Sequence, residues 1–299
     1  MSRVSAPRQP TRGQGRNRRR AAFGILALVL AAAVYLVLAT TVLAPVDRHG
    51  ADLVHLTVRS EAVGADLGVN VIVPPRAGPR GERSLLVFLH GRGGSEQSSN
   101  EMVFAGLPSL RGRRGPVVAF PDGGDHGYWH NRREGRWATY VMHEVIPLAV
   151  RRFGIDAGRV AIGGISMGGY GAYDLALAHP GRFCAVGGHS PALWFEAGET
   201  APGAFDGSAD FERNDVIEAV RDDPDAFDGT KVWIDYGAAD PFRAYDEGFV
   251  DAARAGNADL SAHSWPGGHD GEYWNAHWPA YQRFYLNALN HCGGDPAAG

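Results

Sequence analysis

The 299-residue chain has few cysteines, almost no lysine and no internal repeat. Two cysteines are too few for a disulfide-rich scaffold, and neither has a His or Cys at zinc-site spacing. Lys231 is the one lysine among 29 basic residues, an arginine bias that says nothing about the fold. What is present is an ordinary globular composition, 44% hydrophobic and 21% charged, with enough residues for one large core.

The first 20 residues contain no acidic side chain and seven arginines: Arg3, Arg8, Arg12, Arg16, Arg18, Arg19 and Arg20. Without these seven, the 29 basic residues become 22 against 33 acids, so the rest of the chain carries a net charge of −11. A run of 26 residues without charge follows, at positions 21–46. Such a run can cross a hydrocarbon core of about 30 Å, for which roughly 20 residues suffice. It is also longer than the roughly 7–15 apolar residues of a cleaved signal peptide.

These features predict a basic cytoplasmic tail at residues 1–20, a transmembrane signal-anchor at 21–46 and a catalytic domain at 47–299. Because arginines stay on the cytoplasmic side, the domain should lie outside the cell membrane. A secreted product is the alternative, since Val42-Leu43-Ala44 offers a small-residue cleavage site, although Pro45 disfavours the peptidase. The apolar run beside the basic tail argues against nucleic acid as its partner.

Apolar patterning beyond residue 50 alternates between the periods of strands and helices. Residues 53–59 and 67–73 alternate apolar and polar side chains, which predicts an antiparallel opening pair. Continuously apolar runs predict strands buried on both faces at residues 85–89, 117–120, 160–162, 184–186 and 232–234. Helical periodicity occurs at residues 137–153, 170–179, 216–221, 245–255 and 273–289. This alternation predicts an α/β fold with a mainly parallel central sheet flanked by helices.

A Gly-x-Ser-x-Gly sequence stands where one such strand meets a helix. The segment reads Val160-Ala161-Ile162-Gly163-Gly164-Ile165-Ser166-Met167-Gly168-Gly169-Tyr170. In that context the serine occupies a sharp, strained turn, a nucleophile elbow, between two small residues. The helix N-terminus beneath the serine favours developing negative charge. The alternative is a glycine-rich turn that only closes a strand.

Ligands of such sheets bind beyond the carboxyl ends of the strands. A candidate acid and a candidate base both occur in loops that follow strands. Asp240 lies in the loop after residues 232–234, where a carboxylate can orient a histidine ring. Asp235 is its competitor, but it falls at the end of the strand itself and suits a structural role. His269 lies between the last strand and the last helix, and its imidazole can take and return the serine proton. His263 and His277 are alternative bases.

The glycine-rich loop after residues 85–89 reads His90-Gly91-Arg92-Gly93-Gly94. Its backbone N–H groups can point at a reacting carbonyl and so form one half of an oxyanion hole. The second donor would be the N–H of Met167, the residue after the serine. A tight turn with no ligand is the alternative for the loop.

With these motifs the chain resembles the esterase D-type branch of the α/β-hydrolases, which includes S-formylglutathione hydrolases, feruloyl and acetylxylan esterases and mycobacterial mycolyltransferases. The most branch-specific piece is His-x-x-Glu-Tyr-Trp, from His269 to Trp274. The resemblance covers roughly residues 50–290 and implies an α/β-hydrolase fold. It also implies a role for each motif residue, with the nucleophile, acid, base and two oxyanion donors at Ser166, Asp240, His269, Arg92 and Met167. Mycolyltransferases use Glu as the acid and lack His at the position of His90, and these departures favour plain esterases.

Three tryptophans are candidates for substrate contact: Trp129, Trp194 and Trp274. Trp129 follows the strand at residues 117–120, and Trp194 opens an insertion at about residues 194–230 that can form a small lid. Aromatic side chains at a pocket mouth suit apolar acyl groups or sugar faces. Alternatively, Trp129 and Trp194 only wedge loops onto the sheet. In the same fold Cys184 opens a strand and Cys292 ends the last helix, so the two either form a disulfide at one end of the sheet or remain thiols.

The sequence therefore predicts a membrane-anchored serine carboxylesterase that hydrolyses a small-molecule or glycolipid ester through an acyl-enzyme, without a metal or an organic cofactor. One alternative keeps this chemistry and transfers the acyl group to an envelope glycolipid or sugar. The other is a non-catalytic surface binding protein, whose usual sign would be a broken triad.

Overall fold

The computed structural model describes residues 46–292. The expected basic tail at residues 1–20 and all but the last residue of the expected span at 21–46 lie outside the described residues. Between residues 46 and 292, no helix combines the length and the hydropathy that a membrane crossing requires.

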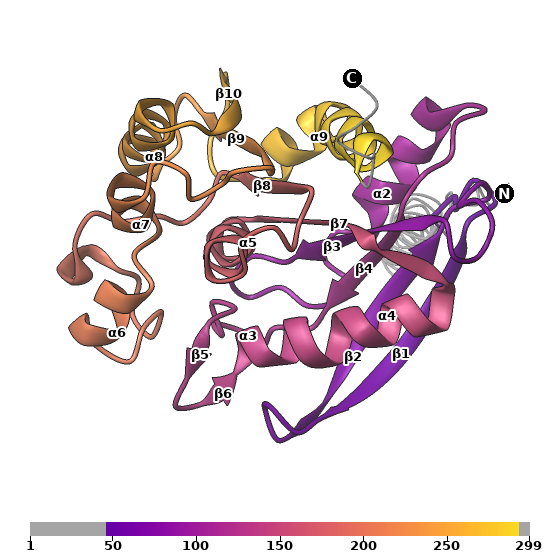
Figure 1. Cartoon of the computed structure of the whole chain (residues 1–299), viewed down its shortest axis with the longest axis horizontal. Helices are drawn as coiled ribbons and strands as arrows, with labels where there is room; N and C mark the ends of the chain where they lie inside the picture. Colours follow the sequence, from indigo (N-terminus) through magenta and orange to yellow (C-terminus); the bar gives the residue numbers. More distant parts are fainter. Residues whose placement is uncertain (1–45, 293–299) are drawn as a thin grey trace, which may run out of the picture. The chain divides into compact units, whose positions relative to one another are not determined.

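An eight-stranded sheet forms the centre of the domain, in the order β1-β2-β4-β3-β7-β8-β9-β10 (Figure 1). β1 pairs antiparallel with β2 and β2 with β4, while every later neighbouring pair is parallel. The strands are β1 (Asp52–Ser60), β2 (Ala65–Val73), β3 (Arg83–Leu89), β4 (Val117–Pro121), β7 (Ile155–Ile165), β8 (Ala185–His189), β9 (Lys231–Gly237) and β10 (Asp259–Trp265). The mainly parallel sheet with an antiparallel opening pair is thus confirmed.

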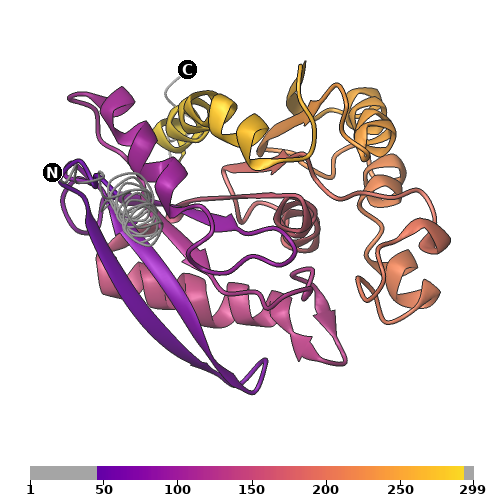
Figure 2. The same ribbon diagram turned by 180° about the vertical axis from the view of Figure 1, so that it is seen from behind.

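Helices cover both faces of this sheet (Figures 1 and 2). One face carries α3 (Trp137–Thr139), a π-helical segment (Tyr140–Val145), α4 (Ile146–Phe153), α5 (Met167–Ala178), α7 (Val216–Asp222) and α8 (Arg243–Ala255). The other carries α2 (Asn100–Gly106) and α9 (Gly271–His291). All five expected helical segments are therefore present, and the segment at 137–153 contains the π-helical turn.

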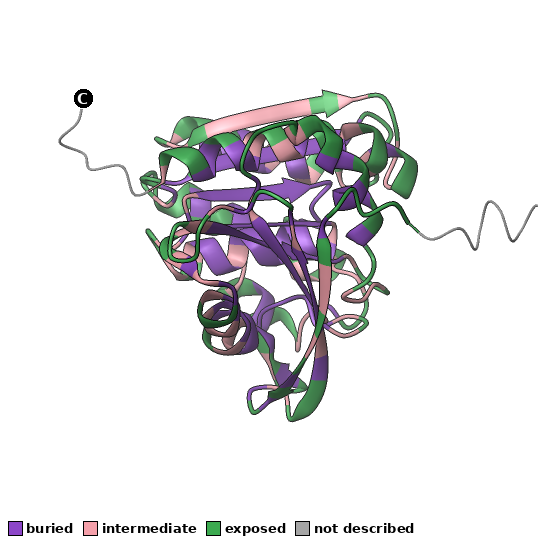
Figure 3. Ribbon diagram, turned by 90° about the vertical axis from the view of Figure 1, so that its right-hand side faces the viewer, coloured by how far each residue is buried: buried purple, intermediate pink, exposed green. Residues whose placement is uncertain are grey.

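Two hydrophobic clusters, one on each face of the sheet, form the core. β3 illustrates why its sequence is continuously apolar: Leu85, Val87 and Leu89 join one cluster, while Leu86 and Phe88 join the other. Successive side chains of a strand point to opposite faces, so a strand covered on both sides has no polar position. The carboxyl-terminal halves of the central strands are accordingly buried (Figure 3).

Three short elements do not follow from the periodicity of the sequence: α2, the hairpin of β5 (Asn131–Arg132) and β6 (Gly135–Arg136), and α6 (Ser208–Arg213). Each is shorter than the window in which a hydrophobic period can be recognised. α6 and α7 lie within the insertion expected at about residues 194–230.

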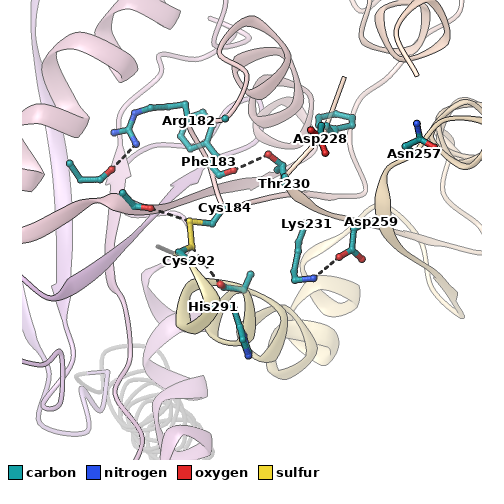
Figure 4. Close-up of a pocket in the computed structure, with 16 residues that line it drawn as sticks. Arg182, Phe183, Cys184, Asp228, Thr230, Lys231, Asn257, Asp259, His291 and Cys292 are labelled. Carbon is teal, nitrogen blue, oxygen red and sulfur yellow. Dashed lines mark hydrogen bonds and ion pairs between the residues drawn. A yellow bond between two sulfur atoms is a disulfide. The ribbon is translucent and has the colours of Figure 1, made fainter. Parts of the chain in front are cut away.

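Cys184 and Cys292 form a disulfide that closes a segment of 108 residues. Cys184 immediately precedes β8, and Cys292 caps the C-terminus of α9. The disulfide lies in the wall of a pocket of about 840 Å³ that Arg182, Lys231 and Asp259 also line (Figure 4). These residues stand at the amino ends of β8, β9 and β10, whereas the serine of the elbow follows the carboxyl end of β7. The pocket and the elbow therefore occupy opposite edges of the sheet.

Candidate active site

Ser166 occupies the single residue between the end of β7 and the start of α5. Its backbone has φ 54° and ψ −116°, a conformation that costs about 1–3 kcal/mol for a residue with a side chain. A Cβ atom at Gly168 would overlap the carbonyl of Leu89, and one at Gly164 would overlap Gly168 itself. The close approach of these backbones is the reason why the motif needs glycine on both sides of the serine.

Backbone hydrogen bonds hold the strained serine from the neighbouring strand. The Ser166 N–H donates to the carbonyl of His189 at 3.1 Å, and the Ser166 carbonyl accepts from Ala192 N–H at 3.0 Å. His189 is the last residue of β8, so the sheet continues into the turn on that side. Ser166 nevertheless remains partly exposed to solvent.

Three side chains from three separate loops meet in a linear arrangement. Nε2 of His269 lies 2.9 Å from Oγ of Ser166, and Nδ1 of the same ring lies 2.9 Å from Oδ2 of Asp240. Asp240 follows β9, and His269 follows β10. Carboxylate, imidazole and hydroxyl thus form the relay in which a serine can lose its proton to a histidine that a carboxylate orients.

The competing acid and bases lie elsewhere in the domain. Asp235 is fully buried within β9, where it binds other partners. His263 stacks on Trp265 from β10, with ring centroids 4.9 Å apart, and His277 stacks on the same tryptophan from α9 at 4.1 Å. Among the described residues, the hydroxyl of Ser166 has its hydrogen bond with His269 alone of the three histidines.

The surroundings of Asp240 favour its ionised form. Burial alone would raise the pKa of this carboxyl, but hydrogen bonds to His269 and to the N–H of Phe242 outweigh it and bring the pKa below the ordinary 3.8. The Phe242 N–H donates to Oδ1 at 2.8 Å, which leaves Oδ2 for the imidazole. At neutral pH the residue is therefore an anion that can stabilise an imidazolium next to it.

The glycine loop after β3 borders the nucleophile. A Cβ atom at Gly91 would lie 3.4 Å from Cβ of Ser166. The buried His90 ring accepts the Gly123 N–H on Nε2 at 2.9 Å, so Nδ1 carries the proton that it shares with the Gly91 carbonyl at 2.8 Å. His90 thereby holds the glycine loop in place through these two hydrogen bonds.

Two backbone N–H groups at this loop and turn are available to a ligand. Gly93 N–H donates to Asp125 O and Gly94 N–H to Gly91 O, whereas Arg92 N–H has no acceptor within the described part of the chain. Met167 N–H is the first of α5 and has no intrahelical acceptor. Both are the donors that the sequence predicts for an oxyanion hole.

A comparison with known proteins identifies the family of the chain. The family model described as "Putative esterase" matches residues 60–285. The chain belongs to this esterase family. This membership agrees with the esterase branch and the α/β-hydrolase fold that the motifs resemble.

Two curated relatives are similar over part of their length. Esterase Rv1288 of Mycobacterium tuberculosis is 30% identical over 155 residues, which is 48% of this chain and 34% of the relative. The chain thus spans about a third of that protein. S-formylglutathione hydrolase of Paracoccus denitrificans is 28% identical over 211 residues, 62% of this chain and 74% of the relative. Among solved structures, a ferulic acid esterase superposes with a TM-score of 0.71 at 19% identity, covering 80% of this chain and 98% of that one, and so shows the fold.

Only one of the three candidate tryptophans in this chain lies beside the triad. The ring of Trp274 is 5.2 Å from that of His269, edge to face. Trp129 is fully buried, and its Nε1 donates to His90 O at 3.3 Å. Trp194 is 4% exposed and packs against Tyr128. These positions support the alternative in which Trp129 and Trp194 wedge loops onto the sheet, because a buried ring has no surface to offer a substrate.

A buried hydrogen bond joins the insertion to the loop after β4. Nε2 of His130 lies 3.1 Å from Oδ2 of Asp210, which belongs to α6, and both side chains are buried. Arg132 also donates to the carbonyls of Gly203 and Ala204 at 2.6 and 3.1 Å. The sequence gives no signal for these contacts, because the partners lie some 70 to 80 positions apart in segments without a recognisable period. These hydrogen bonds therefore hold the insertion against the rest of the domain.

Proposed function

We propose that this esterase is a serine carboxylesterase in which Ser166 is the nucleophile, His269 the general base and Asp240 the orienting acid. The observation that carries the proposal is the unbroken line of hydrogen bonds from Asp240 through His269 to Ser166. Each link has the 2.6–3.2 Å length, roughly, that proton transfer requires. The strained backbone of the serine and the two free N–H donors beside it supply the remaining parts.

The reaction proceeds in two halves. Oγ of Ser166 attacks the ester carbonyl while Nε2 of His269 takes its proton, and the N–H groups of Arg92 and Met167 stabilise the resulting oxyanion. The C–O bond to the alcohol breaks, and His269 returns the proton to the departing alcohol. Water then attacks the acyl-enzyme with His269 as base, releasing the carboxylic acid and the free serine.

We further propose that the enzyme is anchored in the cell membrane through residues 21–46 and acts on its outer side. The seven arginines before that run and its length support this orientation. The disulfide between Cys184 and Cys292 is a second support, because disulfides persist in oxidising compartments outside the cytoplasm.

The test compares the full chain in detergent with Ser166→Ala, using p-nitrophenyl esters of increasing acyl length. We expect turnover in the wild type and its loss in the variant, and the preferred chain length would begin to define the acyl site. His269→Ala and His263→Ala are matched substitutions of a histidine, and only the first should abolish turnover. A folded wild type without turnover on any ester would contradict hydrolysis.

Transfer of the acyl group to a sugar is the second candidate function. The ring of Trp274 beside His269 favours it, because a partly exposed aromatic ring next to the base can pack on the face of a sugar acceptor. Product analysis in the presence of a sugar distinguishes the two: an acylated sugar indicates transfer, and free acid alone indicates hydrolysis.

A further inference from the structure

Asp235 is a fully buried carboxylate that the proposed triad does not use. Four donors converge on its two oxygens. Oδ1 accepts from Nδ1 of His189 at 2.7 Å and from Nε1 of Trp233 at 2.6 Å. Oδ2 accepts from the hydroxyls of Tyr273 at 3.0 Å and Tyr281 at 2.7 Å. Burying a charged group costs several kcal/mol unless hydrogen bonds compensate it. The four donors provide that compensation for the Asp235 carboxylate.

The tyrosine hydroxyls remain protonated donors throughout the physiological range. Burial, followed by the negative charge of Asp235, raises the pKa of Tyr273 and of Tyr281 far above its ordinary value. A carboxylate without a proton can only accept hydrogen bonds. Donors and acceptor are therefore matched, and the network is a rigid link between β8, β9 and α9.

One arm of this network reaches the nucleophile. His189, whose ring is held by Asp235, is the residue whose carbonyl accepts the Ser166 N–H at 3.1 Å. The next residue, Ser190, donates its N–H to the Asp235 carbonyl at 2.6 Å. The end of β8 is thus fixed to Asp235 through both side chain and backbone, and the elbow is fixed to β8.

A second arm reaches the base. Tyr273 lies in the first turn of α9, four positions after His269, and its N–H donates to the capping carboxylate of Asp270 at 2.9 Å. Its ring packs on Gly267, where a Cβ atom would lie 2.7 Å from Cδ2 of the tyrosine. The carbonyl of the same glycine accepts the Ala239 N–H at 2.9 Å, so the loop of His269 is also bound to the loop of Asp240. The hydroxyl of Tyr273 therefore fixes the end of the loop that faces α9.

We infer that Asp235 and Tyr273 are positioning residues that keep His269 within hydrogen-bond distance of Ser166. The inference rests on the proposed function, since it concerns the geometry of the same site. A misplacement of about 1 Å can cost about 10²-fold in rate, and a histidine on a loop needs an anchor to avoid it.

Tyr281 supplies the matched control. It donates to the same oxygen of Asp235 from the same helix, but it lies eight residues further along α9 than Tyr273. Removal of either hydroxyl leaves Oδ2 with one donor fewer in an equally buried place. Only Tyr273 also contacts the loop of the base.

The experiment compares the full chain in detergent with Tyr273→Phe, Tyr281→Phe and Asp235→Asn. We measure kcat and KM for p-nitrophenyl acetate, the rate at which a fluorophosphonate labels Ser166, and the thermal unfolding temperature. For Tyr273→Phe we expect kcat and the labelling rate to fall about 10-fold or more, with KM changed by less than about twofold. Tyr281→Phe should lower the unfolding temperature comparably while kcat stays within about twofold of the wild type.

Equal kcat losses in the two tyrosine variants, or none in either, would overturn the inference and show a purely structural network. Asp235→Asn should lose both kcat and thermal stability, and if it does not fold, the tyrosine pair decides alone. A wild type with neither turnover nor labelling at Ser166 would instead overturn the proposed function, and this inference with it.

Discussion

Oδ2 of Asp240 lies 2.9 Å from Nδ1 of His269, and Oδ1 of the same carboxylate accepts the N–H of Phe242. This geometry predicts the effect of Asp240→Asn. The amide can keep the shape of the side chain, but it presents an NH₂ group or a weaker acceptor to the ring and so favours the wrong tautomer. We expect kcat to fall about 10³- to 10⁴-fold, with a small change in KM, in steady-state kinetics on a p-nitrophenyl ester.

Asp235→Asn does not serve as the control for that variant, because Asp235 belongs to the network behind the site. The exposed Asp251 on α8 does, and Asp251→Asn should keep kcat within about twofold of the wild type. A kcat for Asp240→Asn near that of the wild type would contradict the role of Asp240.

The glycine after Met167 gives a steric prediction. A Cβ atom at Gly168 would overlap the Leu89 carbonyl and press on the loop of His90, so Gly168→Ala must displace the elbow or that loop. We expect loss of at least about 10²-fold in kcat, the order seen when an oxyanion donor is misplaced. Gly198→Ala is the matched control, since nothing lies within 4 Å of a Cβ there, and it should leave kcat unchanged. Full activity in Gly168→Ala would show that the backbones do not approach so closely.

Much of this site can be predicted from the sequence, because its catalytic residues lie on loops that directly follow strands. The sequence predicts Ser166, Asp240 and His269 on loops beyond three strands, and the parallel sheet brings those loops to one edge. A strand buried on both faces must be continuously apolar, so its end and the loop beyond it are visible in the sequence alone. The hydrogen bonds that join the three side chains are the result of that placement.

Other features depend on contacts that no local pattern encodes. The pairing of His130 with Asp210 joins two irregular segments, and the four donors on Asp235 come from β8, β9 and α9. The sequence around Trp129 does not distinguish a tryptophan that lines a pocket from one that fills the core. Only the packing of the folded chain shows that Trp129 is buried. The span at residues 21–46 stays a prediction, because residues up to 45 are outside the described part of the chain.

The disulfide predicts a stability effect without a catalytic one. Cross-linking residues 108 positions apart restricts the unfolded chain, and loops of about that length are stabilised by about 3–5 kcal/mol. Replacing both Cys184 and Cys292 by Ser should lower the free energy of unfolding in urea by that amount. Because the sulfurs lie at the amino ends of the strands, opposite the triad, kcat should remain unchanged.

Dithiothreitol provides the control for the disulfide. It should destabilise the wild type to the level of the double serine variant and leave that variant unaffected. Wild-type stability that does not respond to complete reduction would contradict a stabilising disulfide.

Asp246 predicts how stability depends on pH. Neither of its oxygens has a hydrogen-bond partner among the described residues, and burial, followed by the nearby charges of Asp240 and Asp235, raises its pKa well above 3.8. The folded chain therefore binds a proton that the unfolded chain releases above about pH 3.8, so stability from this group is full below that pH and is lost as pH rises towards the folded pKa.

Asp246→Asn removes this titration while keeping the shape. We expect equal free energies of unfolding for variant and wild type near pH 3.5, and a gap in favour of the variant that widens by about 1.4 kcal/mol per pH unit above about pH 4. Urea unfolding at several pH values measures the gap. A difference that is constant across pH would show that Asp246 is not the proton-binding group.

Covalent labelling of the full chain by a fluorophosphonate tests whether His269 activates Ser166 as the nucleophile. The reagent forms a stable bond with a serine that a histidine has activated, and mass spectrometry of the digested protein locates it. We expect one modified residue, Ser166, with turnover lost in proportion to labelling, and no labelling in His269→Ala. Inactivation through another residue, or an active enzyme that the reagent leaves unmodified at Ser166, would contradict it.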